Sequence, residues 1–219
     1  LFSKGVNFNS NSDTEVLLNL YLTDGKEMLS KLNGIFAFAI WDERDKSLFI
    51  ARDGFGVKPL YYALLNNSFF FASEIKALTP ILEESDQLNI KALQSYLTYL
   101  WCPGKQTPIK SVNKLLPGEA MIIIEGIIDS CWKWYYPKVF QKKSNKSMSQ
   151  STAIKGTLDH LRTAVNRQMV ADVSVGAFLS GGLDSSAIVA LASEQNENIR
   201  CFTIAVSYTH LRAHETFTD

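Results

Sequence analysis

Several features typical of membrane, secreted or nucleic-acid-binding proteins are missing from this sequence of 219 residues. No apolar run reaches the roughly 20 residues that a membrane-spanning helix needs. No basic segment followed by an apolar one opens the chain, as a secretory signal peptide would. Lysine plus arginine number 22, as do aspartate plus glutamate. The resulting balance gives no electrostatic reason to expect a nucleic acid or a membrane surface as a partner.

Cysteine is also scarce. The three cysteines, Cys102, Cys131 and Cys201, lie far apart and show no CxxC spacing. An odd number without such spacing argues against a disulfide framework and against a zinc site. We therefore expect a protein of a reducing compartment, the cytoplasm.

Apolar and aromatic residues are plentiful and follow clear periods in the first part of the chain. Ser12 and Glu15 have the S-x-x-E spacing of a capping box, and an apolar stripe at helical spacing follows them. From Gly34 the period becomes that of strands. Residues 34–53 predict two strands joined near Glu43–Lys46, and residues 59–74 predict two more joined at Asn66–Asn67. A helix from about Asn89 and a strand after a Pro117–Gly118 turn complete this part.

The segment 138–152 is polar, rich in lysine and serine, and without period, so we interpret it as a linker between two domains. Residues 153–206 then alternate helix, strand, loop, helix and strand. Leu158, Leu161, Val165 and Met169 share one helical face, and residues 173–179 form a short apolar run typical of a buried parallel strand. This order predicts the beginning of a doubly wound α/β domain.

The loop between that strand and the next helix reads SGGLDSS, residues 180–186. Its glycines would let the backbone approach an anion, and the amides of the following helix would point at it. No lysine follows the glycines as in a Walker A loop, and Asp184 would need a divalent cation between itself and a phosphate. The loop therefore fits either a pyrophosphate held with Mg²⁺ or the plain capped start of a helix.

The motif S-G-G-x-D-S-S after an apolar strand resembles the PP-loop of ATP pyrophosphatases, and residues 171–190 resemble the synthetase domain of glutamine-hydrolysing asparagine synthetases. Residues 12–78 resemble the class II glutamine amidotransferase domain of the same family, although the family usually has arginine at the position of Gly54. The resemblance implies an N-terminal nucleophile-type αββα glutaminase domain over residues 1–137, then a PP-loop domain. It favours the phosphate-binding interpretation of the loop.

The resemblance also implies roles for individual residues. Asp13, in S-D-x-E, would bind the α-amino group of glutamine. The ATP-binding positions would be Leu179, Ser180, Gly181, Gly182, Asp184, Ser185 and Ile204, with Asp184 also meeting Mg²⁺. Glutamine, aspartate and ATP would be the substrates, and the full-length protein could form a homodimer.

The family's glutaminase nucleophile is an N-terminal cysteine whose own α-amino group serves as the base. No cysteine lies near Leu1, so we expect no catalytic residue of that step in this chain. Residues 207–219 resemble a translated sequencing adapter, and we expect them to be non-native. Their His210 and His214 lack a third ligand, so they do not indicate a metal site. We expect a chain cut at both ends and inactive by itself.

Two other functions fit the same residues. A related enzyme could amidate or cyclise a different carboxylate, as β-lactam synthetases do. A catalytically silent module could bind glutamine or ATP without turnover. Phosphoribosyl-type amidotransferases fit less well, because their second domain carries no S-G-G-x-D-S loop.

Overall fold

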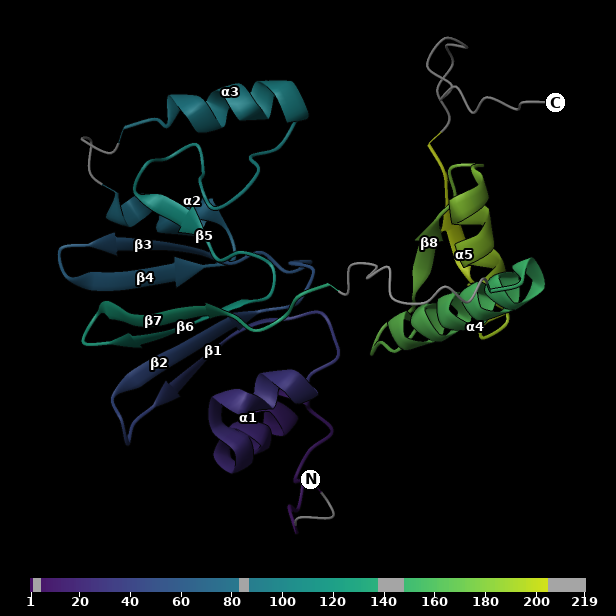
Figure 1. The fold of residues 1–219 in the computed structure, drawn as a ribbon, viewed down its shortest axis with the longest axis horizontal. Coiled ribbons are helices and arrows are strands. Elements are labelled where there is room, and N and C mark those ends of the chain that lie inside the picture. Colours follow the sequence, from purple (N-terminus) through teal and green to yellow (C-terminus); the bar gives the residue numbers. More distant parts are fainter. Residues whose placement is uncertain (2–4, 83–86, 138–147, 205–219) are drawn as a thin grey trace. The chain divides into compact units, whose positions relative to one another are not determined.

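The structure, a computed structural model, describes residues 1, 5–82, 87–137 and 148–204. The chain divides into two compact units, residues 1–140 and 141–219 (Figure 1). Residues 138–147 of the predicted linker and the whole predicted non-native tail lie outside the described residues. No helix in the described parts is both long and apolar enough to cross a membrane.

The first unit is built on two antiparallel sheets. One has four strands in the order β1 (Ala37–Asp42), β2 (Ser47–Arg52), β6 (Glu119–Ile124) and β7 (Ile127–Lys133). The other has three strands in the order β4 (Ser68–Ala72), β3 (Tyr61–Leu65) and β5 (Val112–Lys114). Helices lie beyond both sheets in Figure 1: α1 (Asp13–Asp24) and the 3₁₀ helix η2 (Gly25–Lys31) on one side, α2 (Ile75–Leu78) and α3 (Ile90–Tyr99) on the other.

Both predicted hairpins are confirmed. Asp42 pairs with Ser47 at the end of the β1–β2 hairpin, and Leu65 pairs with Ser68 at the end of the β3–β4 hairpin. Asn66 and Asn67 have φ angles of 50° and 57°. Two left-handed residues in a two-residue loop match the twist of the flanking strands, and asparagine tolerates that conformation better than most residues.

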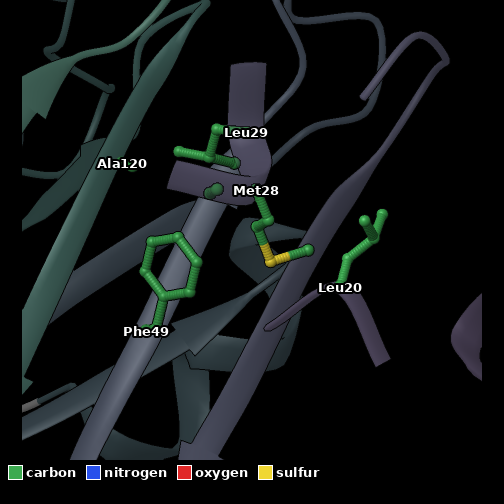
Figure 2. Packing of buried hydrophobic residues seen from close by; sticks show 6 residues of the cluster. Leu20, Met28, Leu29, Phe49 and Ala120 are labelled. Carbon is green, nitrogen blue, oxygen red and sulfur yellow. The ribbon is translucent and has the colours of Figure 1, made fainter. Parts of the chain in front are cut away.

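One apolar core lies between the helices at the start of the chain and the four-stranded sheet. Met28 and Leu29 pack with Leu20 of α1 and with Phe49 of β2, and all four side chains are buried. Figure 2 shows the Phe49 ring next to Met28 and Leu29. Phe49 also stacks on Trp132 of β7, with ring centroids 6.0 Å apart. These contacts hold α1 and η2 on one face of the sheet.

A second core lies between the two sheets, and a third lies under α2. Ile50 of β2 faces away from Phe49 and packs with Tyr62 and Leu115. On the far side of the second sheet, Ala63 and Val112 pack against Leu78 of α2. Three cores separate four layers, helix, sheet, sheet and helix. The αββα arrangement is therefore confirmed.

Some elements were not predicted from the sequence. They are β5, β7, α2 and a second 3₁₀ helix, η3 (Thr79–Ile81). The sequence predicts one helix over residues 12–32, which the structure divides into α1 and η2. The strand β7 alternates half-buried and exposed residues, but its polar members Asp129 and Ser130 weaken the apolar period. Pairing with β6 decides its conformation, which is a tertiary effect.

The second unit contains α4 (Gln150–Gln168), β8 (Gly176–Phe178), α5 (Leu183–Ser193) and β9 (Arg200–Phe202). Strands β8 and β9 pair in parallel, as a strand–helix–strand unit requires. Val165 of α4 is buried with Leu191 and Ala192 of α5, and Leu161 and Met169 pack beside them. Leu158, predicted on the same face, is exposed.

Two boundaries differ from the sequence prediction. Helix α4 begins at Gln150, inside the predicted linker, because the Ser149 hydroxyl accepts a hydrogen bond from the Thr152 amide and caps the helix there. Strand β8 covers only part of the predicted 173–179. Val173, expected to be buried in that strand, is largely exposed.

Candidate functional site

The start of α1 places Asp13 at the first helical position. The Ser12 hydroxyl caps the helix by accepting a hydrogen bond from the Thr14 amide at 3.2 Å. The predicted capping box is wrong in its second half, because Glu15 does not return to the Ser12 amide. Its carboxylate accepts hydrogen bonds from the amides of Asn9 and Ser10, each at 2.8 Å, and the Asn9 bond in particular lowers the Glu15 pKa.

Asp13 lines a cavity of about 700 Å³ together with β1 residues 37–41. The Asp13 side chain is exposed, and its Oδ1 accepts a hydrogen bond from Thr14 Oγ1 at 3.3 Å. The apolar walls come mainly from β1 and the residues before it. Polar groups in the lining, besides Asp13 and Thr14, come from Lys58 and Ser73. A cavity with a carboxylate at a helix start and a lysine elsewhere fits a small zwitterionic ligand.

The loop after β2 is held by the buried carboxylate of Asp53. Its oxygens accept hydrogen bonds from the amides of Phe55, Val57 and Lys58, all at 3.0 Å. The side chain of Arg52 then donates to the carbonyl oxygens of Gly56, Lys58 and Leu115, each at 2.6 Å. Desolvation lowers the pKa of Arg52, but the guanidinium group stays protonated and charged at neutral pH. These contacts order the loop that carries Lys58.

Gly54 in the same loop lies against Tyr135. A Cβ atom added at residue 54 would come within 2.6 Å of Cδ1 in the Tyr135 ring. An arginine at this position therefore requires the Tyr135 ring to move. Packing against Tyr135 therefore explains the glycine at this position.

The second candidate site is the loop between β8 and α5. Gly181 has a φ angle of 86°, a left-handed conformation that glycine adopts without strain. Gly182 is the N-cap of α5 and gives the helix no side-chain cap, so amides of its first turn are left for another acceptor. The predicted loop residues Ser180 and Ser185 come together, with their hydroxyl oxygens 3.0 Å apart.

The predicted nucleoside positions lie at the carboxyl ends of the two parallel strands. The Leu179 amide donates to the Phe202 carbonyl at 2.8 Å, so the residue continues the pairing just past β8. Ile204 lies two residues past β9 and is largely exposed. The carboxyl edge of a parallel sheet is where ligands of α/β folds bind, so both residues lie at the expected edge.

The Asp184 carboxylate lies in the first turn of α5 and is exposed. No cluster of three or more acidic, histidine or cysteine residues that could hold a metal occurs among residues 1, 5–82, 87–137 and 148–204. Mg²⁺ often binds through one or two carboxylates together with substrate phosphates. A single exposed Asp184 beside uncapped amides fits that mode and does not fit a cage made by the protein alone.

Sequence reasoning missed Lys58, Arg52 and Asp53. The signal was present as R-D-G-F-G-V-K-P, in which an Arg–Asp pair precedes glycines and a Lys–Pro pair. A buried aspartate that accepts several loop amides is recognisable only once the loop is folded, because its partners lie up to five residues away.

Comparison with known proteins assigns the chain to a family. Residues 1–136 match the family described as glutamine amidotransferase domain. The chain belongs to that family. In addition to this glutamine amidotransferase domain, residues 156–217 match the family described as asparagine synthase.

Curated relatives of the amidotransferase chain include two from Bacillus subtilis. Asparagine synthetase [glutamine-hydrolyzing] 1 is 39% identical over 93% of this chain and 32% of its own length. Asparagine synthetase [glutamine-hydrolyzing] 3 is 40% identical over 88% of this chain and 31% of its own length. The amidotransferase chain therefore spans about a third of the relatives it matches.

More distant relatives carry other names. Amidase chry2 of Gibberella zeae is 33% identical over 85% of this chain and 27% of its own length. A solved glutamine phosphoribosylpyrophosphate amidotransferase from B. subtilis covers 94% of this chain and 42% of its own, at 18% identity and a TM-score of 0.44. That structural likeness is too low to carry an argument.

Proposed function

We propose that the protein makes asparagine from aspartate with ammonia released from glutamine, at the expense of ATP. The observation that carries the proposal is the order of two family matches on one chain, an amidotransferase domain followed by the start of an asparagine synthase domain. Relatives named as glutamine-hydrolysing asparagine synthetases match across both parts. The three cysteines, all unpaired, support a cytoplasmic location.

In the first unit, Asp13 would bind the α-ammonium group of glutamine. The carboxylate is exposed at the cavity, and the charge-assisted bond that it would form is stronger than one between neutral groups. Asp13 would thus orient glutamine without taking part in bond cleavage.

In the second unit, the loop 180–185 would bind the phosphates of ATP. Uncapped amides of α5 and the hydroxyls of Ser180 and Ser185 would donate to phosphate oxygens, and Leu179 and Ile204 would contact the nucleoside. Mg²⁺, held by Asp184, would neutralise phosphate charge. The reaction transfers AMP to the side-chain carboxylate of aspartate and releases pyrophosphate. Ammonia then displaces AMP, and the loop's donors stabilise charge on the departing pyrophosphate.

The experiment is an assay of protein expressed from the complete reading frame that contains this sequence. Glutamine, aspartate, ATP and Mg²⁺ are supplied, and asparagine, AMP and pyrophosphate are measured. We expect the three products in equal amounts. Amide formation on a different carboxylate would favour a related amidotransferase, and ligand binding without any product would favour a silent binding module.

Because some relatives carry other names, the carboxylate that this protein amidates must also be tested. Two fungal proteins named amidases match this chain at 30–33% identity. A panel of carboxylates offered in place of aspartate therefore belongs in the same assay. Aspartate is the expected acceptor because the relatives with 39% and 40% identity carry the asparagine synthetase name.

A further inference from the structure

The first unit has a second cavity, of about 620 Å³, which we call the α3 cavity. Among the described residues, it shares no lining residue with the cavity beside β1. Its walls come from the carboxyl end of α3 and the segment after it, from the loop after β2, and from β3 and β5. Figure 1 shows the chain returning from α3 to β5 on this side of the unit. The volume lies in the range of small-molecule sites.

Much of the lining of the α3 cavity is aromatic. Its four aromatic side chains are Phe55, Tyr61, Tyr96 and Trp101. Phe55, Tyr96 and Trp101 are exposed, so their rings present apolar surface to the solvent. A flat apolar ligand would remove that surface from water and could stack on the rings.

Two cations line the same cavity without an acidic partner. The lining contains Arg52 and Lys114, and no aspartate or glutamate is among its described residues. In the described parts of the chain, no ion pair joins either cation to a carboxylate. Desolvation lowers the pKa of Lys114, and the nearby charge of Arg52 also lowers it. An anion in the cavity would offset the repulsion between the two cations.

The ammonium group of Lys114 is held by neutral groups. It donates a hydrogen bond to the carbonyl oxygen of Cys102, and its Nζ lies 5.7 Å from the centroid of the Trp101 ring. An ammonium group has three donors, so donors remain for a ligand. Because the lysine is already held beside an aromatic wall, a ligand that meets both would order few further side chains.

We propose that the α3 cavity binds a small aromatic monocarboxylate, with its carboxylate at Lys114 and its ring against the aromatic side chains. The inference does not depend on the proposed function. The carboxyl end of α3, which ends at Tyr99, lines the cavity through Tyr96 and Leu100. The last carbonyl groups of a helix carry partial negative charge, which disfavours a phosphate dianion more than a monoanion. A singly charged carboxylate is therefore the anion that fits both the cations and the helix end.

The test titrates the 219-residue chain with three probes that share one ring system. 2-Naphthoate carries the carboxylate, 2-naphthamide is its uncharged counterpart, and 2-naphthyl phosphate carries a dianion. Binding is followed by NMR chemical-shift changes of the backbone amides. We expect 2-naphthoate to have a Kd about tenfold lower than that of 2-naphthamide, the order expected for a hydrogen bond between charged groups. The shifts should fall within residues 52–61 and 96–117.

Four variants separate charge from structure. Lys114→Met should raise the Kd for 2-naphthoate about tenfold and leave that for 2-naphthamide unchanged. Lys114→Arg keeps the positive charge and should retain most of the affinity. Trp101→Ala should weaken both ligands by a similar factor, because both use the ring. Lys91→Met removes an exposed lysine from α3 outside the cavity and should leave both affinities unchanged.

Four results would overturn the inference. Equal affinities of the unaltered chain for 2-naphthoate and 2-naphthamide would mean that the cavity takes neutral aromatic compounds. An equal loss of both ligands in Lys114→Met would mean that the lysine acts only on the structure. Tighter binding of 2-naphthyl phosphate than of 2-naphthoate would assign the site to phosphate esters instead. If no probe shifts the amides of residues 52–61 and 96–117 at millimolar concentration, the cavity is not a binding site.

Discussion

At the scale of single residues, Asp42 shows how one buried carboxylate ties α1 to the end of β1. Its oxygens accept from Arg44 Nε at 2.9 Å, from Arg44 Nη2 at 2.5 Å and from the Tyr21 hydroxyl at 3.1 Å. The hydrogen bond with Arg44 holds the pKa of Asp42 well below its usual range. Tyr21 lies in α1, so the cluster links elements that are distant in the sequence.

This cluster predicts a specific acid sensitivity. Because the folded pKa of Asp42 is depressed, its contribution to stability is present above the unfolded pKa of about 4 and is lost as the pH falls below that value. Asp42→Asn should therefore lower the urea midpoint at pH 7 and flatten its dependence between about pH 5 and pH 2. Urea unfolding followed by circular dichroism checks both. Equal pH slopes in the two proteins would contradict the assignment.

Two glycines with positive φ angles allow two costs of a Gly→Ala substitution to be told apart, the cost of backbone strain and the cost of a steric clash. Gly104 has a φ of 72° and open space where a Cβ would lie. Gly126 has a φ of 78°, and a Cβ there would lie 2.3 Å from the carbonyl oxygen of Asn67. Gly104→Ala should cost about 1 kcal/mol of unfolding free energy from strain alone, and Gly126→Ala should cost at least about 2 kcal/mol.

Denaturant unfolding of both variants measures the difference. Gly34→Ala is the matched control, because Gly34 has an ordinary φ angle and open space around it. Its effect should stay within about 0.5 kcal/mol. If Gly126→Ala costs no more than Gly104→Ala, the close approach of the β6–β7 turn to the Asn66–Asn67 turn is not needed for stability.

At the scale of elements, the loop between β8 and α5 is the strand-to-helix junction on which the proposed ATP site depends. Gly181 has a φ of 86°, and a Cβ added there would meet no other atom within 4 Å. The cost of Gly181→Ala therefore comes only from the left-handed backbone conformation, since the added methyl group meets no other atom. We expect it to shift the first-turn amides of α5 and to lower ATP–Mg²⁺ affinity about tenfold, as loss of a charge-assisted hydrogen bond would.

Titration with a fluorescent ATP analogue measures that affinity. Gly156→Ala in α4 is the control, because the added methyl group meets nothing within 4 Å and alanine favours the helix. Its ATP affinity should equal that of the unaltered chain. Unchanged affinity in Gly181→Ala would argue against phosphate binding by this loop.

The elements differ in how far local sequence determines them. The hairpins at Asp42–Ser47 and Leu65–Ser68 were predicted because their strands alternate and their turns use suitable residues. The strand β5 is three residues long and forms only where Val112 pairs with Ala63 of β3. No local period distinguishes such a strand, since its hydrogen-bond partners come from a distant part of the chain.

At the scale of the whole molecule, the two units carry separate candidate sites. Asp13 and Lys58 belong to the first unit, and the loop 180–185 belongs to the second. Each unit has its own buried core, three clusters in the first and one in the second. A ligand that binds one unit should therefore stabilise that unit by mass action.

Hydrogen–deuterium exchange of the 219-residue chain tests this separation. ATP–Mg²⁺ should slow exchange at residues 179–186 and in α5, and leave β1 and β2 unchanged. L-Glutamine should slow exchange at the start of α1 and at residues 53–58. Protection of the first unit by ATP would contradict independent sites.

The sequence alone determined the order of the two units, the hairpins of the first and the glycine loop of the second. These depend on local properties: hydrophobic period, turn residues and a short motif at a strand-to-helix junction. Only the tertiary structure decided that Lys58 shares a cavity with Asp13 and that Asp53 orders the loop that carries Lys58. It also decided that Glu15 accepts hydrogen bonds from Asn9 and Ser10 rather than from Ser12. The reason is physical. A contact between distant residues depends on how sheets and helices pack, and no local pattern in the chain records that packing.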